Sequence, residues 1–312
     1  MAMTPTANLS LDLDNKWAYL RAAGRADWAV RPGYLRLVIP RIVDMLGELK
    51  LPLTVFIVGR DLEDQENVAA IESFRSLRGC EFANHSYNHL PWLHTLSELE
   101  IQAEIDRTSL AIETQLATKP LGFRGPGFSC PTEVLRVLAS RGFVYDASLF
   151  PTSIAPLART VFLLRSGLDA EQRKKASKLY GGWSSALQAN RPYLRMIGEA
   201  RLWELPVTTL PIFRTPIHFS YLTFLAGFSR LAAKAYFRNA MALCHRTGTA
   251  PSLLLHPPDF LGREDDSDMA YFPAMKIMRA DKLEIVRWAL TLFAKRFEVK
   301  RMIDHAAELQ TA

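Results

Sequence analysis

The stretch PLTVFIVG, Pro52–Gly59, decides the fold class of this 312-residue chain. Its β-branched and aromatic residues run without interruption to a glycine, which is the pattern of a buried strand. The segment ENVAAIESFRSL (66–77) has helical character, and CEFANHS (80–86) has the pattern of a second, short strand. Strand, helix and strand in this order predict a βαβ unit, in which the two strands lie parallel in one sheet.

The same alternation extends to both sides of this unit. Upstream, ANLSLDLD (Ala7–Asp14) has the pattern of a strand, and Leu35–Lys50 has helical apolar spacing that Pro40 breaks early. Downstream, Ser97–Ala117 has the pattern of a long amphipathic helix with a capping box at its start. Three further segments continue the alternation: a strand that runs into a Gly/Pro turn at LGFRGPGFS (121–129), a helix at PTEVLRVLASRG (131–142) and a strand at FVYDASLF (143–150).

Between about Pro151 and Ala200 the alternation fails. This segment is basic, helical only in part and rich in bulky apolar residues, and we expect it to form an insertion or a lid. Regular elements then return: a strand at LWELPVTTLP (202–211), a helix pair or one long helix at 221–248, a strand at APSLLLHPPDF (250–260) and a final packing helix at 281–297.

The whole pattern predicts one α/β domain. No repeat, low-complexity tract or linker divides the chain, so we expect a single domain over residues 1–312. Strands that alternate with helices favour a mostly parallel sheet. In such folds the chemistry lies beyond the carboxyl ends of the strands.

Charge and cysteine content narrow the class of protein. The net charge of +6 comes from 38 basic and 32 acidic residues with no dense basic block, which argues against nucleic acid but leaves an anionic ligand or membrane surface open. The cysteines, Cys80, Cys130 and Cys244, form no CxxC pair, so neither a disulfide framework nor a thiolate zinc site is expected. The first residues lack a signal-peptide pattern, and no apolar run approaches the ~18 residues that suggest a transmembrane helix. We expect a cytoplasmic protein.

Polar residues follow the predicted strands at the points where the strands end. One polar residue at a strand end is ordinary, but several at the same edge of a parallel sheet indicate a site. The set comprises Asp12, Asp14, His85, His89, Arg124, Asp146 and His256.

A metal site is the first hypothesis for this edge. Asp12 and Asp14 are two apart on a strand, so their carboxylates point to the same face. His85 and His89 are four apart, which places them on one face of a helix or helical turn. Asp14 with the two histidines makes a one-carboxylate, two-imidazole set that leaves coordination positions for water and substrate. A solvated aspartate turn and two unrelated histidines remain the alternative at this point.

Four short motifs in this order resemble the polysaccharide deacetylases, the NodB-like group of carbohydrate esterase family four. They are LDLDN (11–15), NHSYNH (84–89), FRGPGF (123–128) and LLLHPP (253–258). The usual Thr-Phe-Asp-Asp-Gly of the family is Leu-Asp-Leu-Asp-Asn here, which is closer to the Asp-x-Asp subgroup. The resemblance implies a distorted (β/α) barrel of the NodB type, with its active site at the carboxyl ends of the strands.

The resemblance also implies a role for each matching residue. Asp12 matches the catalytic base and Asp14 the metal carboxylate. His85 and His89 match the histidine ligands of one divalent ion, for which zinc is the expected metal. His256 matches the catalytic acid.

Five more residues take roles from the same resemblance. Arg124 matches the arginine that holds the base aspartate, and Pro126 shapes the substrate groove. Phe128 stands where tyrosine is usual, and its backbone N–H is expected to serve the oxyanion. Asp146 is the candidate for the catalytic Asp-Trp motif of the family, which is missing in its usual form. Trp92, three residues after the second histidine, is expected to contact substrate.

These roles imply a metal-dependent hydrolase of carbon–nitrogen bonds that removes an acetyl or formyl group from a carbohydrate. The Asp-x-Asp opening and the strand PVTTLP (206–211) resemble enzymes that act on lipid-linked, cell-envelope amino sugars. The basic, apolar segment Pro151–Ala200 suits peripheral contact with an anionic inner membrane, and a soluble lid is its alternative. No obligate protein partner is evident. Two other functions stay open: hydrolysis of a non-sugar amide, as in allantoinase-like relatives, and metal or carbohydrate binding without turnover.

Overall fold

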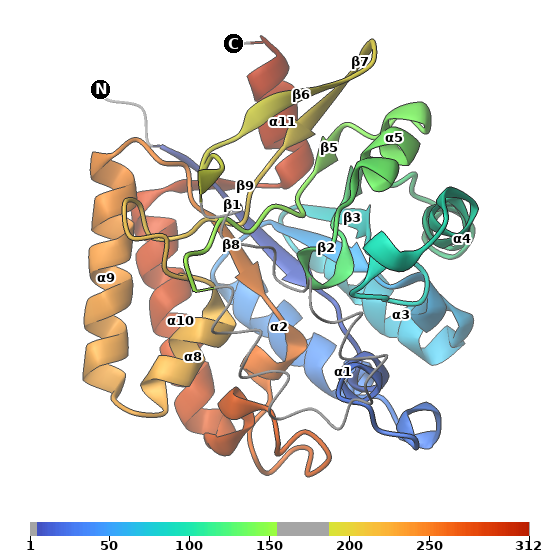
Figure 1. The fold of residues 1–312 in the computed structure, drawn as a ribbon. Helices are drawn as coiled ribbons and strands as arrows, with labels where there is room; N and C mark the ends of the chain where they lie inside the picture. Colours follow the sequence, from blue (N-terminus) through green and yellow to red (C-terminus); the bar gives the residue numbers. More distant parts are fainter. Residues whose placement is uncertain (1–4, 155–186, 312) are drawn as a thin grey trace.

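The computed structural model describes residues 5–154 and 187–311, and a curled, mostly parallel sheet lies at its centre (Figure 1). Neighbouring strands follow the order β6-β7-β5-β4-β3-β2-β1-β8, and β9 pairs with β1. The predicted α/β class is confirmed. The strands are β1 (Thr6–Asp12), β2 (Leu53–Ile57), β3 (Cys80–Asn84), β4 (Gly122–Phe123), β5 (Tyr145–Asp146), β6 (Tyr193–Ile197), β7 (Ala200–Glu204), β8 (Ser252–Leu255) and β9 (Glu298–Lys300).

Helices lie on both sides of the sheet in Figure 1, with α8, α9 and α10 to one side and α3, α4 and α5 to the other. The capping box predicted at the start of the long helix is present in α4, where Ser97 and Glu100 bond each other's backbone. The helices are α1 (Lys16–Ala22), α2 (Leu35–Glu48), α3 (Gln65–Glu72), α4 (Glu98–Leu116), α5 (Thr132–Ser140), α8 (Phe219–Ala226), α9 (Arg230–Arg246), α10 (Arg279–Arg296) and α11 (Met302–Thr311).

The βαβ unit predicted from Pro52–Gly59 is the middle of this sheet. Every residue of β2 is buried, and the strand pairs in parallel with β1 and β3. Asp12 pairs with Phe56 and Ile57 pairs with Asn84, so the three strands end close together. This register brings the residues that follow β1 and β3 to one edge of the sheet.

The sheet curls until its two ends approach each other. Thr208, in the segment after β7, donates its N–H to the carbonyl of Ser252 on β8 at 3.0 Å, and Ser252 donates back to the Thr208 hydroxyl at 2.8 Å. β8 also pairs with β1, where Leu255 lies opposite Leu11. His256, directly after β8, therefore comes to the same edge as the end of β1.

The region before residue 150 differs from the prediction in two details. Pro40 does not break the predicted helix, because α2 runs through it from Leu35 to Glu48. Pro40 is exposed, so the missing hydrogen bond lies on the solvent side while the buried face of the helix continues. The predicted strands 121–129 and 143–150 shrink to 2 residues each in β4 and β5.

The region after residue 187 differs more. β6 and β7 form an antiparallel hairpin at the edge of the sheet. Of the two alternatives for 221–248 the helix pair is present, as α8 and α9. The helix predicted to be last, α10, is followed by β9 and α11, because a strand of 3 residues is too short to show a pattern in the sequence.

The insertion or lid predicted at Pro151–Ala200 falls mainly on residues 155–186, which lie outside the described residues. Within residues 5–154 and 187–311, no helix is both long enough and apolar enough to cross a bilayer. Membrane contact therefore stays a prediction.

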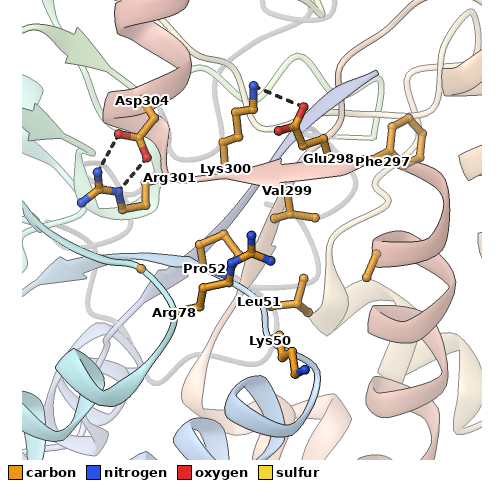
Figure 2. Close-up of a pocket in the computed structure, with 12 residues that line it drawn as sticks. Lys50, Leu51, Pro52, Arg78, Phe297, Glu298, Val299, Lys300, Arg301 and Asp304 are labelled. Atoms are coloured by element: carbon orange, nitrogen blue, oxygen red, sulfur yellow. Dashed lines mark hydrogen bonds and ion pairs between the residues drawn. The ribbon is translucent and has the colours of Figure 1, made fainter. Parts of the chain in front are cut away.

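A hollow of about 490 Å³ opens at the amino ends of β1 to β3 (Figure 2). We call it the amino-end hollow. Arg301 pairs with Asp304 at 2.6 Å, and Lys300 pairs with Glu298 at 3.3 Å. The charged residues that line it are Lys50, Arg78, Glu298, Lys300, Arg301 and Asp304. It lies at the opposite end of the sheet from the polar residues that the sequence singles out.

Candidate active site

Asp12 and Asp14 enter one site from the end of β1. The N–H of Leu13 donates to the Phe56 carbonyl at 3.0 Å, which keeps the backbone extended beyond the strand. Both carboxylates reach His85, as the i, i+2 spacing predicts. Oδ2 of Asp12 lies 3.9 Å from Nε2 of His85, and Oδ1 of Asp14 lies 3.3 Å from the same nitrogen.

His85 and His89 converge from a loop, not from a helix. Ser86 and His89 have positive φ angles of 60° and 49°, which a helical turn does not contain. The predicted helical turn is therefore wrong, although the two rings still approach, with centroids 5.0 Å apart. Glu104 of α4 holds the loop by accepting from the backbone N–H and the side-chain amide of Asn88. A contact from a distant helix fixes this shape, and the local spacing cannot reveal it.

Asp14, His85 and His89 form a set that fits a metal ion. Their ligand atoms lie within 4.8 Å of one another, and all three residues are buried. Oδ1 of Asp14 lies 2.9 Å from Nε2 of His89, yet neither atom has a hydrogen-bond partner. Buried polar atoms without partners are rare, and one carboxylate with two imidazoles suits a divalent ion such as zinc.

Neighbouring groups set the proton position of His85 and the charge of Asp14. Nδ1 of His85 lies 2.6 Å from the carbonyl of Arg124. Because a carbonyl only accepts, Nδ1 carries a proton, so when the ring is neutral the lone pair is on Nε2, the nitrogen that faces Asp14. Burial raises the pKa of Asp14, but the combined effect of His89 and His85 is larger and opposite. The resulting pKa of Asp14 is well below its ordinary value. Asp14 is therefore a carboxylate, as a metal ligand must be.

Arg124 holds Asp12 from inside the fold. Its side chain is fully buried, and Nη1 donates to Oδ1 of Asp12 at 2.6 Å and to the Ser10 hydroxyl at 3.0 Å. Nε donates to the carbonyl of Ala147 at 2.9 Å. Since the guanidinium engages Oδ1, Oδ2 is the oxygen of Asp12 that faces the site.

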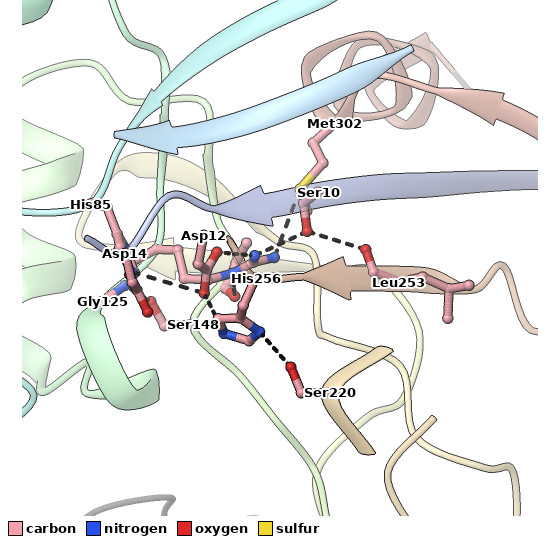
Figure 3. Close-up of polar contacts among 12 residues, drawn as sticks. Ser10, Asp12, Asp14, His85, Gly125, Ser148, Ser220, Leu253, His256 and Met302 are labelled. Carbon is pink, nitrogen blue, oxygen red and sulfur yellow. Dashed lines mark hydrogen bonds and ion pairs between the residues drawn. The ribbon is translucent and has the colours of Figure 1, made fainter. Parts of the chain in front are cut away.

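His256 lies on the other side of Asp12. Its Nε2 is 3.9 Å from Oδ2 of Asp12, which is also the distance from that oxygen to Nε2 of His85. Its Nδ1 lies 3.1 Å from the hydroxyl of Ser220 (Figure 3). The structure thus brings Asp12, the metal set and His256 together around one carboxylate oxygen.

The predicted substrate residues lie in two loops. Pro126 is buried, and Phe128 has a φ of +62° with its ring 4.8 Å from that of Phe150. The N–H of Phe128 donates to the Gly125 carbonyl at 2.9 Å. That N–H is engaged within the turn, and the use of a backbone N–H near Phe128 for the oxyanion stays a prediction. Trp92 is half-buried in the loop after β3.

Asp146 contacts residues that hold the turn after β4, not residues of the metal set. Its Oδ1 accepts from the Ser148 hydroxyl at 2.5 Å, and the oxygen of that hydroxyl accepts the Gly125 N–H at 2.8 Å. Its Oδ2 accepts from the thiol of Cys130 at 3.3 Å. Burial and the neighbouring Asp146 raise the pKa of Glu204 well above its ordinary range. These contacts support the turn, and none of them reaches the metal set.

Sequence reasoning missed several residues that hold the site from outside. Tyr34 donates its hydroxyl to the Asp14 carbonyl at 2.8 Å, and Asp259 accepts the N–H of His256 at 2.8 Å. The signal for Asp259 is its place three residues after His256, where an acid can cap a turn. No local signal marks Ser220, which is 36 positions from His256 in the sequence.

Comparison with known proteins gives a family match over part of the chain. Residues 32–145 match the family model described as polysaccharide deacetylase. Among curated proteins, the chain is similar to the peptidoglycan deacetylase-like protein FGM2 of Gibberella zeae, with 30% identity over 127 residues. These residues are 39% of this chain and 34% of that protein, so the chain spans about a third of the length of the relative.

Solved structures share the fold over the whole chain. One is a candidate polysaccharide deacetylase from Mycobacterium smegmatis, with a TM-score of 0.64, 20% identity and coverage of 100% of this chain and 92% of that one. Another is PuuE allantoinase, with a TM-score of 0.58, 12% identity and coverage of 100% and 93%. At these identities the likeness concerns the fold alone.

The sequence match covers only part of the candidate site. The matched residues 32–145 contain His85, His89 and Arg124, while Asp12, Asp14 and His256 lie outside them and join the site through the fold. Residues 32–145 thus match the polysaccharide deacetylase family model, and the solved structures share the fold of the chain.

Proposed function

We propose that this chain is a metal-dependent amide hydrolase of the Asp-x-Asp subgroup that removes an N-acetyl or N-formyl group from a carbohydrate. One observation carries the proposal. Oδ2 of Asp12 lies 3.9 Å from Nε2 of His85 on one side and 3.9 Å from Nε2 of His256 on the other. A proton acceptor thus stands between a donor set for a divalent ion and a histidine that can give a proton.

The proposed metal ligands are Asp14, His85 and His89, and the proposed metal is zinc. When bound there, the ion supplies Lewis acidity, which polarises an amide carbonyl and makes nearby water more acidic. The other steps belong to side chains of the protein.

Asp12 is the proposed general base. Arg124 engages Oδ1 at 2.6 Å and fixes the orientation of the carboxylate. Oδ2 then accepts a proton from the water that attacks the amide carbon. The buried guanidinium also supplies the positive charge that a buried carboxylate needs.

His256 is the proposed general acid. Its Nδ1 faces Ser220 and its Nε2 faces Asp12, so Nε2 is the atom that gives a proton to the departing amine. Base and acid are different residues at the ends of adjacent strands, β1 and β8. A proton can therefore be taken on one side of the amide and given on the other.

Acetylated carbohydrate is the substrate class that the family match supports. The fold does not separate a sugar from a small non-sugar amide, because an allantoinase shares it. Release of amine therefore has to be measured on both classes. With zinc-loaded protein we expect amine release from N-acetylated or N-formylated amino sugars, loss of that release with a chelator, and no reaction with allantoin.

Two other outcomes replace this proposal. Turnover of allantoin without release of any sugar amine would assign a non-sugar amide as the substrate. One full equivalent of bound metal without turnover of either class would make the chain a binding protein. Asp12→Asn, loaded with metal to the same extent, is the matched control for contaminating hydrolases.

A lipid-linked sugar is the finer substrate proposal. It rests on the basic and apolar residues of Pro151–Ala200, since such a mixture suits an anionic membrane surface. We expect the protein to sediment with anionic vesicles at low salt and to be released as salt rises. Equal sedimentation with neutral and anionic vesicles would contradict the lipid-linked substrate and leave amide hydrolysis untouched.

A further inference from the structure

His256 is held from behind by buried polar groups that the steps above do not use. Nδ1 faces the hydroxyl of Ser220, in the first turn of α8, at 3.1 Å (Figure 3). Asp259 is fully buried, and its Oδ2 accepts the backbone N–H of His256 at 2.8 Å. Lys282 of α10 is 1% exposed and donates to two backbone carbonyls of the turn that carries Asp259.

The second oxygen of Asp259 is the unexplained atom in this group. Oδ1 is buried and has no hydrogen-bond partner. Burial raises the pKa of Asp259, and His256, Lys282 and the Ser220 hydroxyl oppose that rise, so the hydroxyl lies close to the carboxyl group. An acceptor without a donor beside a hydroxyl that can rotate suggests that this hydroxyl donates to Oδ1 of Asp259 whenever Nδ1 of His256 carries a proton.

We propose that Ser220 is a positioning residue for His256: its oxygen accepts from Nδ1–H, and its own O–H then turns to Oδ1 of Asp259. The inference rests on the proposed function, in which His256 gives a proton from Nε2. It adds a serine-mediated link from that histidine to a buried carboxylate.

Counting donors and acceptors supports this arrangement. A serine hydroxyl has one proton, so it can donate either to Nδ1 or to Oδ1 of Asp259. Donation to Asp259 leaves the serine oxygen as an acceptor, which requires a proton on Nδ1. The neutral ring is then the Nδ1–H tautomer, and Nε2, on the Asp12 side, is the atom that gains and loses the second proton.

Other charged groups around the ring fit the same scheme. Asp12 faces Nε2 from β1, with Oδ2 at 3.9 Å. His218 lies before α8 with its ring centroid 6.3 Å from that of His256, and burial lowers the pKa of His218 to about 3, so it stays neutral. Asp259 and Lys282 lie behind Ser220 and offset each other's charge. The contact with Ser220 therefore determines which ring nitrogen of neutral His256 carries the proton.

The direct test is the tautomer of His256, measured by 15N NMR of histidine-labelled protein. The His256→Gln spectrum assigns the signal by subtraction. We expect the neutral ring of the wild type to be mainly the Nδ1–H form and that of Ser220→Ala to be mainly the Nε2–H form, which is usual in water. An Nε2–H ring in the wild type, or the same tautomer in both proteins, overturns the relay.

Turnover provides a second readout. Ser220→Ala should lower kcat roughly tenfold with KM nearly unchanged, and the high-pH limb of kcat should move down by about one pH unit, because the charged ring loses an acceptor. Ser220→Thr keeps the hydroxyl and should restore both. The matched control is Ser252→Ala on β8, whose buried hydroxyl has no partner and should leave the pH profile unchanged.

The two proposals fail in different ways. The tautomer can be read in protein that turns over nothing, so a wild-type Nδ1–H ring that is lost in Ser220→Ala supports the relay even if no N-acyl sugar is hydrolysed. Conversely, sugar deacetylation with an unchanged pH profile in Ser220→Ala keeps the proposed function and removes the relay. Equal effects of Ser220→Ala and Ser252→Ala would reduce Ser220 to a packing residue.

Discussion

The two ends of the central sheet are both polar, yet they differ in how their polar atoms are satisfied. In the amino-end hollow, Arg301 and Asp304 pair at 2.6 Å with side chains 36% and 41% exposed (Figure 2). At the carboxyl end, Arg124 and Asp12 pair at the same 2.6 Å with 0% and 6% exposed. Among the described residues, none that lines the hollow has a buried polar side-chain atom without a partner, whereas the metal set has three such atoms, on Asp14 and His89.

This difference shows why neither volume nor charge marks a functional site. Exposed ions are satisfied by water, and their pairing contributes about 0–1 kcal/mol. A buried polar atom left unpaired destabilises a protein by about 1–3 kcal/mol. A fold that keeps several such atoms at one place keeps them for a ligand, and in this chain that place is the end of β1.

Removing a proposed histidine ligand should have the largest effect, and it tests directly whether the carboxyl end of the sheet binds a metal ion. His85→Ala or His89→Ala should abolish stoichiometric binding of zinc and with it turnover, because two remaining ligands do not hold a catalytic ion. Metal content after dialysis, measured by mass spectrometry, checks this. His245→Ala on α9 removes an exposed histidine and should retain a full equivalent. A full equivalent of zinc in His85→Ala would show that the ligand set is wrong.

The two aspartates of β1 allow a finer separation. Asp12→Asn should keep the metal and lower kcat by about 10²–10⁴, because it removes a base and keeps an oxygen for Arg124. Asp14→Asn should weaken metal affinity itself. Isothermal titration with zinc beside steady-state kinetics distinguishes the two. If the two phenotypes are exchanged, base and ligand have been assigned to the wrong aspartates.

Asp61 allows a test of how an unpaired buried oxygen near the site affects the free energy of unfolding. Its Oδ2 has no partner, while Oδ1 accepts from Asn15 and Trp17 at 2.8 Å. Burial raises the pKa of Asp61 from 3.8 to about 7. The folded state therefore binds the proton more tightly than the unfolded state, and stability is lost as pH rises from about 4 to about 7.

Asp61→Asn should remove this pH dependence. We expect the variant to be more stable than the wild type by about 1–3 kcal/mol at pH 8 and to lose that advantage at pH 4, as measured by urea unfolding at both values. Asp304→Asn in the hollow is the control, because that carboxylate is exposed and ion-paired. An advantage that is the same at pH 4 and pH 8 would contradict the raised pKa.

The smallest effects are expected at the amino-end hollow. Arg78→Ala and Lys300→Ala should change the free energy of unfolding by no more than about 0.5 kcal/mol and leave turnover within twofold. Thermal unfolding and initial rates test both. A tenfold fall in kcat for either variant would mean that the two ends of the sheet are coupled, and the contrast between them would then no longer hold.

Residues that act through their own type and spacing could be predicted from the sequence. Asp12 and Asp14 share a face because strand geometry has a fixed period of two. The strand at Pro52–Gly59 has an apolar run that only a buried position explains, and it became β2. These predictions needed no information from distant parts of the chain.

Features that depend on long-range contacts could not be predicted. The loop of His85 and His89 takes its shape from α4, and the partner of His256 comes from α8. A hydroxyl such as Ser220 has no recognisable pattern until the chain is folded. The same applies to the Phe128 N–H, which a carbonyl three residues earlier in a tight turn already engages.

The position of β1 has a consequence for how the protein is made. Asn8 on this strand donates its amide to the carbonyl of Lys300 at 3.1 Å, across 292 positions of sequence. A ribosome adds about 5–20 residues per second, so β1 is synthesised about 15–60 s before β9. Until β8 and β9 have been made, the edge of β1 that faces away from β2 has no partner. Folding of this centre is therefore slow, because it waits for contacts between distant parts of the chain. We infer that the proposed metal site forms only after β8 and β9 have been made.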